Sequence, residues 1–268
     1  MSQQMPEGLP EDKPSAARIY DYLLGGFQNF EVDRAVARRF IEIMPSAPSM
    51  MRANRAFLRR VVKFLVDQGV EQFLDIGSGI PTVGNVHEIA QNTKPSARVV
   101  YVDADTVAVR HSEAILEGIT NTIVIEANAR QPEVILSNPE VRRVLDLRKP
   151  MAVLIISVLL FVTDDKEAYR LVRVLRDALV PGSYLAISHG TNEGGAREQL
   201  EQSVNLYAAT PNPVKLRSHT QIERFFDGFE LIEPGLVYLP TWRPEGPEDL
   251  WHDEPEMALS YGGVGRKL

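Results

Sequence analysis

The sequence predicts an α/β fold in which a doubly wound, mostly parallel sheet is covered by helices on both faces. From residue 70 onward, short apolar runs typical of buried strands alternate with segments of helical periodicity. Residues 151–158 form the most apolar run of the chain, as expected of a central strand covered on both sides. The segment after Asp164 carries Ala168, Leu171 and Leu175 on one face, as an amphipathic helix does. In such sheets, ligands bind at the carboxyl ends of the strands, near the point where the strand order reverses.

Composition restricts the functional classes. The chain has 268 residues, enough for one large domain, and its net charge of −7 gives no overall field that would attract nucleic acid or an anionic membrane. It contains no cysteine, which excludes disulfides, thiolate metal sites and a cysteine nucleophile. We find no apolar run of membrane-spanning length, no secretion signal, and no cluster of His, Asp and Glu with metal-ligand spacing. These observations predict a cytoplasmic protein without a metal site.

The stretch at residues 71–82 is the strongest local signal. An apolar run ends in two glycines, Gly77 and Gly79, before a helical pattern resumes, and glycines let the backbone turn tightly against a nucleotide-like ligand. Asp75 precedes them, and Thr82 stands where a dinucleotide-binding fingerprint has its third glycine. A carboxylate here would repel a pyrophosphate but suits a cationic amine, such as the aminobutyrate end of S-adenosylmethionine. The alternative is that Asp75 only caps the glycine turn.

Polar side chains also follow the next predicted strands. Asp103 ends the strand after the glycine turn, where an acid holds the hydroxyls of a ribose. Asp105 is the second candidate for that role, and either acid could instead cap the following helix. Asn128 and Ser157 follow two further strands. Four strand ends therefore agree with an adenosine-containing ligand that lies across the sheet.

The N-terminal quarter is predicted to be helical after a mobile tail at residues 1–14, which has little to bury. Helices are expected over residues 15–24, 32–44 and 48–68. The third carries a row of cations that is either a solvated surface or a site for a carboxylate ligand. In the second case Arg52, or its neighbours Asn54 and Arg55, would contact the carboxylate of the ligand.

The C-terminal part yields weaker expectations. His189 follows the fifth predicted strand and is either a base or a hydrogen-bonded structural residue. Thr220 and Glu223 match a capping box. Residues 229–239 and 257–268 are expected to form strands at the edge of the sheet.

Three motifs carry a resemblance to a known family. They are Ala-Arg-Ile-Tyr-Asp-Tyr-Leu-Leu-Gly-Gly at residues 17–26, Arg-Ala-Asn-Arg-Ala-Phe-Leu-Arg-Arg at residues 52–60, and the stretch at residues 73–82 with its Asp-Ile-Gly-Ser-Gly core. That core resembles the first motif of class I S-adenosylmethionine-dependent methyltransferases. Together the motifs resemble the methyltransferase family first catalogued as domain of unknown function 574, a likeness that extends to Tyr-Gly-Gly-Val at residues 261–264.

The resemblance implies a seven-stranded, Rossmann-like methyltransferase sheet with an antiparallel last strand. It implies a helical cap at residues 15–69 over an S-adenosylmethionine-binding domain at residues 70–268. It assigns the glycine turn to the methionine portion of the cofactor, Asp103 to the ribose, and Asn128 with Ala129 to the adenine edge. Cofactor-contacting residues are expected at Tyr22, Gly26, Arg52, Asn54, Asp75, Gly77, Ser78, Gly79, Asp103, Ala104, Asp105, Asn128, Ala129 and Ser157. No catalytic residue is assigned.

The sequence departs from the family pattern at four positions. Phe27 and Gln28 replace a Lys-Asp pair, Asn128 replaces an acid, and Leu160 replaces a histidine. We therefore expect a methyltransferase that uses S-adenosylmethionine on a small-molecule acceptor, with a non-catalytic S-adenosylmethionine-binding protein or a nicotinamide-dependent oxidoreductase as alternatives. A further hypothesis is that Tyr20 and Tyr22 close over the cofactor, and its alternative is ordinary helix packing.

Overall fold

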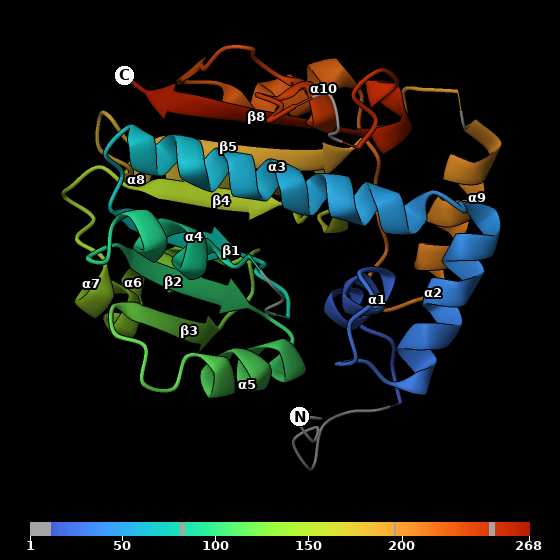
Figure 1. Cartoon of the computed structure of the whole chain (residues 1–268), viewed down its shortest axis with the longest axis horizontal. Coiled ribbons are helices and arrows are strands. Elements are labelled where there is room, and N and C mark those ends of the chain that lie inside the picture. Colours follow the sequence, from blue (N-terminus) through green and yellow to red (C-terminus); the bar gives the residue numbers. More distant parts are fainter. Residues whose placement is uncertain (1–11, 81–83, 196, 247–249) are drawn as a thin grey trace.

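The structure is a computed structural model that describes residues 12–80, 84–195, 197–246 and 250–268. Most of the predicted tail, and Thr82 in the glycine-turn stretch, lie outside the described residues. Figure 1 shows a twisted sheet with helices on both faces and a group of helices beyond one end of its strands. This arrangement confirms the predicted α/β class.

Five parallel strands form the main part of the sheet. They are β1 (Gln72–Ile76), β2 (Arg98–Asp103), β3 (Thr122–Glu126), β4 (Ala152–Ile156) and β5 (Tyr184–Gly190). Their spatial order is β3-β2-β1-β4-β5. The chain therefore builds outward from β1 in one direction and then from β4 in the other, so the switch point lies between β1 and β4.

The antiparallel part differs in detail from the expectation. It contains β6 (Phe229–Leu231), β7 (Val237–Tyr238) and β8 (Ser260–Lys267). Strand β8 is antiparallel, as predicted. It pairs with β5 on one side and with β6 and β7 on the other, so it lies inside the sheet. The two-residue β7 makes the described sheet eight-stranded rather than seven-stranded. The expectation that both C-terminal strands lie at the edge is wrong for β8, because order along the chain does not fix order in space.

The first three helices begin and end within one residue of the predicted limits. The helices are α1 (Ala16–Leu23), α2 (Glu31–Ile43), α3 (Ala47–Asp67), α4 (Val86–Thr93), α5 (Thr106–Ile115), α6 (Pro132–Ser137), α7 (Pro139–Val144), α8 (Asp165–Ala178), α9 (Arg197–Ala208) and α10 (His219–Glu223). The 3-10 turns are η1 (Leu159–Phe161), η2 (Arg224–Phe226), η3 (Leu239–Thr241) and η4 (Pro255–Ala258).

Local chemistry sets several of these limits. Asp164 caps α8 by accepting from the N–H of Glu167 at 2.8 Å, and Gly25 ends α1 in the left-handed conformation with a φ of 84°. The predicted capping box of α10 is wrong in register. Ser218 and Gln221 form it, two residues before the expected pair.

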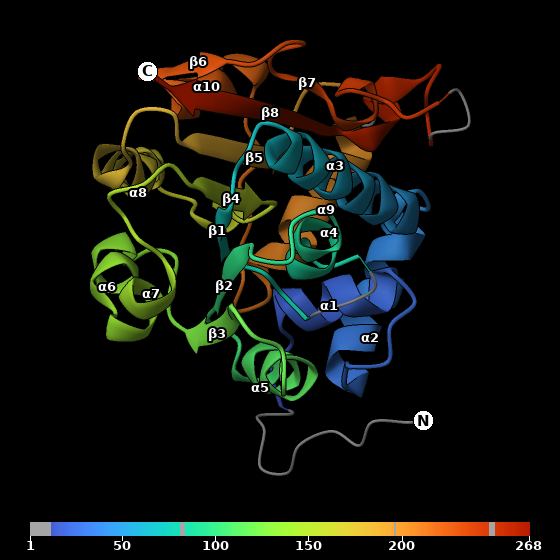
Figure 2. The same cartoon turned by 60° about the vertical axis from the view of Figure 1, so that its left-hand side comes forward.

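Figure 2 shows α6, α7 and α8 on one face of the sheet and α3 and α4 on the other. Successive side chains of each parallel strand point to opposite faces. On β1, Leu74 and Ile76 pack into a cluster with helices α6, α7 and α8, whereas Phe73 faces a cluster that contains α3 and α4. Asp75 follows Phe73 by two residues, so it points to the α3 side. The strand pattern therefore places this carboxylate beneath α3 rather than beneath α8.

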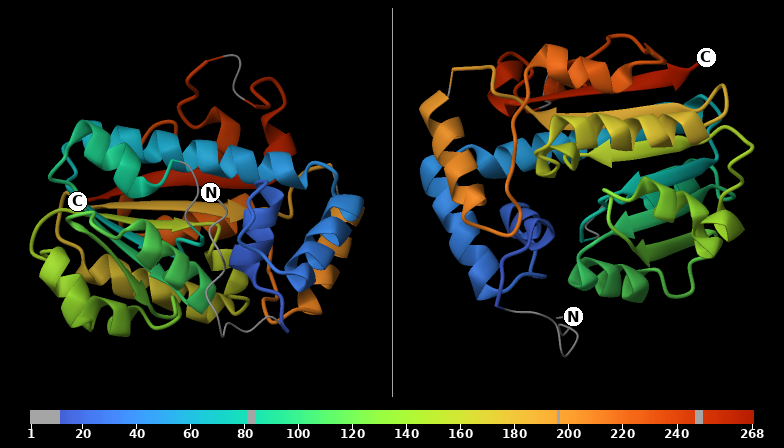
Figure 3. Two further views of the ribbon diagram at one scale, coloured as in Figure 1. Left: turned by 60° about the horizontal axis from the view of Figure 1, so that its bottom comes forward. Right: turned by 180° about the vertical axis from the view of Figure 1, so that it is seen from behind.

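A cap of helices stands beyond the carboxyl ends of the strands. It contains α1, α2 and the start of α3, which share an apolar cluster with Leu200 of α9. Helix α9 follows β5 in the chain yet lies beside α2 (Figure 3). The second half of α3 packs on the sheet through Phe57, Val61 and Leu65. The sequence prediction placed the cap within residues 15–69; the structure adds α9 to it and divides α3 between cap and sheet.

No helix within the described part of the chain combines the length and the apolarity that crossing a bilayer requires.

Candidate functional site

A cavity of about 690 Å³ lies between the switch point of the sheet and the helical cap. All but three of the predicted cofactor-contacting residues line it. The predicted residues that line it are Asn54, Asp75, Gly77, Ser78, Gly79, Asp103, Ala104, Asp105, Asn128, Ala129 and Ser157. The carboxyl ends of four strands thus meet at one site, as their positions in the sequence predicted.

The glycine turn is shaped by two positive φ angles, 72° at Gly77 and 67° at Gly79. The N–H groups of Gly77 and Ser78 both donate to the carbonyl of Val102, at 2.7 and 3.1 Å. A Cβ on Gly77 would lie 2.3 Å from Val158 Cγ2, whereas a Cβ on Gly79 would meet no atom within 4 Å. Gly77 is therefore needed for close packing, and Gly79 leaves open space at the turn.

We expect Gly77→Ala to lower the free energy of unfolding by about 2–4 kcal/mol, because it adds overpacking against Val158 to the strain of a left-handed residue. Gly79→Ala is the matched control, because it carries the same kind of strain without the contact, at about 1 kcal/mol. Urea unfolding measures both variants. Equal losses would contradict the packing role of Gly77.

Asp103 lies beside the glycine turn and is hydrogen-bonded to it. Its Oδ2 accepts from the N–H of Gly79 at 2.7 Å and its Oδ1 from the N–H of Asp105 at 2.8 Å. Burial raises the pKa of Asp103 to about 6, although these two hydrogen bonds oppose the rise. Each carboxylate oxygen keeps a lone pair for a second donor, as a diol ligand requires.

Asp75 is more deeply buried and has a more strongly shifted pKa. It is 5% exposed, and burial raises its pKa to about 7. The positive charge of Arg55 opposes this rise, and the negative charge of Asp103 adds to it. No hydrogen bond to the Asp75 carboxylate is found among the described residues, so the structure gives no support to a capping role.

A chain of four hydrogen-bonded polar side chains connects the sheet to the cap, and three of them, Ser157, Asn54 and Tyr20, line the cavity. The hydroxyl of Ser188 on β5 lies 3.3 Å from that of Ser157 and donates to Asn54 Oδ1 at 2.6 Å. Asn54 Nδ2 donates to the Tyr20 hydroxyl at 3.0 Å, and that hydroxyl donates to the carbonyl of Met51 at 3.2 Å. Ser157 has a φ of 55°, a left-handed conformation that strains a non-glycine residue. The chain fixes α1 and α3 relative to the strand ends.

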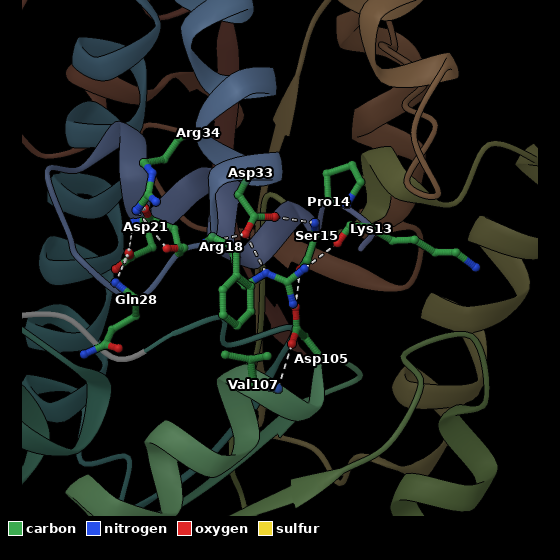
Figure 4. Close-up of polar contacts among 12 residues, drawn as sticks. Lys13, Pro14, Ser15, Arg18, Asp21, Gln28, Asp33, Arg34, Asp105 and Val107 are labelled. Atoms are coloured by element: carbon green, nitrogen blue, oxygen red, sulfur yellow. Dashed lines mark hydrogen bonds and ion pairs between the residues drawn. The ribbon is translucent and has the colours of Figure 1, made fainter. Parts of the chain in front are cut away.

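Asp105 has a structural role, because it caps α5 and accepts a hydrogen bond from Ser15 (Figure 4). Its Oδ1 accepts from the N–H of Val107 at 2.8 Å and caps α5, while its Oδ2 accepts from the Ser15 hydroxyl. Arg18 lies 3.5 Å from the same Oδ2, and its Nε donates to Asp33 Oδ2 at 2.7 Å. Arg18 also donates to the carbonyl of Lys13 at 2.6 Å. We call Ser15, Arg18, Asp33 and Asp105 the clasp, because they tie the segment at residues 13–15 to α2 and α5.

Three predicted residues lie outside the cavity lining. Arg52 is exposed, and its guanidinium donates to the Ser49 hydroxyl at 2.7 Å, whereas Arg55, its alternative, lines the cavity. Tyr22 packs against the apolar cluster of the cap. Gly26 lies against Asp21, which would be 2.0 Å from an added Cβ. The structure thus brings none of these three to the cavity and gives Tyr22 and Gly26 a role in the end of α1.

The residues predicted for the adenine edge lie where β3 ends. Asn128 Oδ1 accepts from the N–H of Arg130 at 2.9 Å, which leaves the side-chain amide as a donor toward the cavity. Ala129 follows it and also lines the cavity, as Ala104 does after β2.

His189 has the structural role. It is fully buried, and its two ring nitrogens contact the Gly190 carbonyl at 2.7 Å and Arg217 Nη1 at 2.9 Å. Burial lowers the pKa of His189 to about 3. A neutral imidazole that uses both nitrogens in this way does not act as a base.

Sequence reasoning missed several lining residues. Lys13 and Pro14 belong to the predicted tail but line the cavity. Phe40 and Tyr207 line the cap side. No local signal pointed to them, because α2 and α9 meet only through tertiary packing.

The fold and the cavity define an α/β protein with its ligand site at the switch point of the sheet. The sequence matches the S-adenosyl methyltransferase family over residues 2–268, so the chain belongs to this family. It is a methyltransferase, and S-adenosylmethionine is its cofactor. This membership removes the nicotinamide-dependent oxidoreductase as an alternative.

Solved structures agree with the family. A candidate methyltransferase from Thermobifida fusca YX is similar at 41% identity and a TM-score of 0.92, with 98% of both chains covered. A DUF574 family protein from Streptomyces avermitilis MA-4680 shares 39% identity at a TM-score of 0.89, covering 96% of this chain and 99% of its own. The N-methyltransferase NodS from Bradyrhizobium japonicum WM9, solved with S-adenosyl-L-homocysteine, shares the fold at 12% identity and a TM-score of 0.50, covering 93% of this chain and 98% of its own. No protein of curated function matches the sequence.

Proposed function

We propose that this enzyme transfers the methyl group of S-adenosylmethionine to a small organic molecule bound on the cap side of the cavity. One observation carries the proposal. A single cavity joins the strand-end residues predicted to hold the cofactor to an apolar surface of the cap, formed by α2, η1 and α9. The cap covers this space, and the chain has a net charge of −7, which favours a small acceptor over a nucleic acid.

The residues present fit the cofactor. Ser78 Oγ is buried without a partner among the described residues, at the turn where Gly79 leaves open space. In this proposal Asp75 faces the cationic amine, Asp103 accepts from the ribose hydroxyls and Asn128 donates to the adenine edge. These roles follow the resemblance and the position of each side chain in the cavity lining.

The protein itself has mainly to align and enclose the reactants. When bound, S-adenosylmethionine supplies a methyl group on a positively charged sulfur. The polar chain from Ser157 to Tyr20 fixes the cap over the strand ends, and Leu160 and Phe161 form an apolar wall beside it. Alignment and exclusion of water are the contributions that such a transfer needs from its enzyme.

We expect S-adenosylmethionine to bind the purified protein in isothermal titration, with NADH as a negative control. Asp103→Asn should weaken binding about 10- to 30-fold, because charge-assisted hydrogen bonds to the ribose are lost. Glu126→Gln is the matched control, since Glu126 pairs with Asp103 in register but does not line the cavity. Equal affinities of the Asp103 variant and the unmodified protein would refute the ribose role, and binding of NADH alone would refute the proposed function.

A further inference from the structure

The cap side of the cavity differs in chemistry from the strand-end side. Its lining is apolar and comes from α2, η1 and α9. We call this part the acceptor compartment and define it by Phe40, Met44, Leu160, Phe161, Leu200 and Tyr207. Phe40, Met44 and Leu200 also belong to the buried cluster that holds the cap helices together. The acceptor compartment is therefore bounded by side chains of a packed core.

Three aromatic rings from separate elements meet in the acceptor compartment. The Tyr207 ring of α9 lies 5.7 Å from the Phe40 ring of α2, at an interplanar angle of 86°. It lies 6.4 Å from the Phe161 ring of η1, at an angle of 56°. Differently inclined rings offer both faces and edges to a bound ring, and aromatic pairs prefer such offset or edge-on geometries.

Tyr207 adds a polar group to this apolar surface. Its hydroxyl has no hydrogen-bond partner among the described residues, although burial raises its pKa and keeps it neutral. The Tyr207 side chain is half-buried, and a tyrosine hydroxyl can both donate and accept a hydrogen bond. Tyr207 lines the cavity, so a ligand with a hydrogen-bonding substituent is the partner that the geometry provides for.

Most charged residues of the cavity lining lie away from the acceptor compartment or are already paired. Asp75 and Asp103 lie at the strand ends, and Arg55 of α3 acts on the pKa of Asp75. Arg18 and Asp105 belong to the clasp, and Lys13 is exposed. Arg130 is paired with Glu167 and donates to the carbonyl of Phe161 at 2.6 Å. A charged ligand in the acceptor compartment would lose its hydration against apolar side chains, which is costly.

We propose that the methyl acceptor is an uncharged, planar aromatic molecule that packs against Phe40, Phe161 and Tyr207 and hydrogen-bonds to the Tyr207 hydroxyl. This inference rests on the proposed function, because it takes the strand-end side as the place of the cofactor.

The test titrates two probes with the same ring system, 2-naphthol and 2-naphthoate, into protein saturated with S-adenosylhomocysteine. We expect 2-naphthol to bind at least tenfold more tightly than the anionic 2-naphthoate. Tyr207→Phe removes only the hydroxyl and should weaken 2-naphthol about three- to tenfold. Val204→Glu places a carboxylate in the α9 part of the lining and should abolish measurable 2-naphthol binding.

Two controls separate the possible outcomes. Tyr169→Phe removes a hydroxyl on α8, outside the cavity lining, and should leave both probes unaffected. Both Tyr207→Phe and Val204→Glu should keep S-adenosylhomocysteine affinity within twofold, which shows that the strand-end side is intact. Suppose that S-adenosylhomocysteine binds, but 2-naphthoate binds as tightly as 2-naphthol or more tightly, or neither substitution changes the affinity for 2-naphthol. The acceptor inference is then wrong, while the proposed function stands. If S-adenosylhomocysteine does not bind the unmodified protein, the proposed function falls and the inference falls with it.

Discussion

Asp75→Asn is expected to weaken S-adenosylmethionine binding about 30- to 100-fold, while the same change stabilises the ligand-free protein at pH 8. The binding loss follows if the carboxylate faces the cationic amine. The gain in stability follows from burial, which raises the pKa of Asp75 to about 7 and so makes its charged form unfavourable. A shift of this size corresponds to roughly 2–4 kcal/mol at a pH where the group is ionised. Urea unfolding at pH 8 measures this gain.

The pH dependence of stability has a definite sign. The folded-state pKa of Asp75 lies above the ordinary aspartate value of 3.8, so between these values the folded protein binds more protons at this group than the unfolded chain does. The contribution of Asp75 to stability therefore rises as the pH falls from about 7 toward 4, and the cost of its charge is fully present above pH 7. Asp75→Asn should remove this dependence.

Cofactor affinity should show the opposite trend. Protonation of Asp75 removes the charge that attracts the amine, so affinity should fall below about pH 7 and binding should release a proton there. Titrations at pH 6.5 in buffers of different ionisation enthalpy measure that proton. In Asp75→Asn only the fall associated with Asp103, whose pKa is about 6, should remain.

Asp227→Asn is the control for this experiment, because it removes an exposed acid outside the cavity lining. It should change neither stability nor affinity measurably. Unchanged affinity in Asp75→Asn would contradict the amine contact. Unchanged stability at pH 8 would contradict the burial of a charged carboxylate.

The strand ends were predictable because their signals are local. A β-branched run followed by an acid or amide fixes both a strand and the residue at its carboxyl end, and parallel strands bring those ends to one edge. Asp75, Asp103, Asn128 and Ser157 reach the same cavity for this reason. The resemblance added the antiparallel last strand and the helical cap, which the local pattern does not contain.

The cap residues were less predictable because side chains point outward all around a helix, and the sequence does not show which of them face the cavity. Arg52 and Arg55 are one turn apart on α3, yet only Arg55 lines the cavity. Helical periodicity shows that α1, α2 and α9 are amphipathic, but which side of each meets a distant cavity depends on packing between segments far apart in sequence. The sequence therefore contained no signal for Tyr207 on α9. Of the two tyrosines expected to close over the cofactor, Tyr20 lines the cavity and Tyr22 does not.

The clasp gives the second large expected effect, on stability. Arg18→Met should lower the free energy of unfolding by about 3–5 kcal/mol, because it leaves the Asp33 carboxylate buried without its cation. Arg18 is 3% exposed and Asp33 is 0% exposed, and their closest atoms are 2.7 Å apart. Among the described residues, the N–H groups of Ser15 and Phe30, at 2.9 and 2.8 Å, would be the only donors still bound to that carboxylate. Urea unfolding at neutral pH measures the loss.

Arg39→Met is the matched control for Arg18→Met. Arg39 forms an exposed ion pair with Glu42 at 2.7 Å on the same group of cap helices, and such surface pairs contribute about 0–1 kcal/mol. A second comparison is the double variant Arg18→Met with Asp33→Asn, which removes the uncompensated charge and should recover more than half of the loss. If the double variant is no more stable than Arg18→Met, the loss comes from packing around Arg18 and not from the uncompensated buried charge of Asp33.

The clasp also links stability to the cavity, because the segment that it holds lines the cavity through Lys13, Pro14 and Ser15. Ser15→Ala removes the hydroxyl contact to Asp105 but keeps the Arg18–Asp33 pair, so it should cost less than about 1 kcal/mol of stability. If the segment shapes the cofactor end of the cavity, Ser15→Ala and Arg18→Met should weaken S-adenosylmethionine binding by similar factors despite their different stabilities. A loss of affinity that instead follows stability across the two variants would show that the clasp acts only by holding the cap folded.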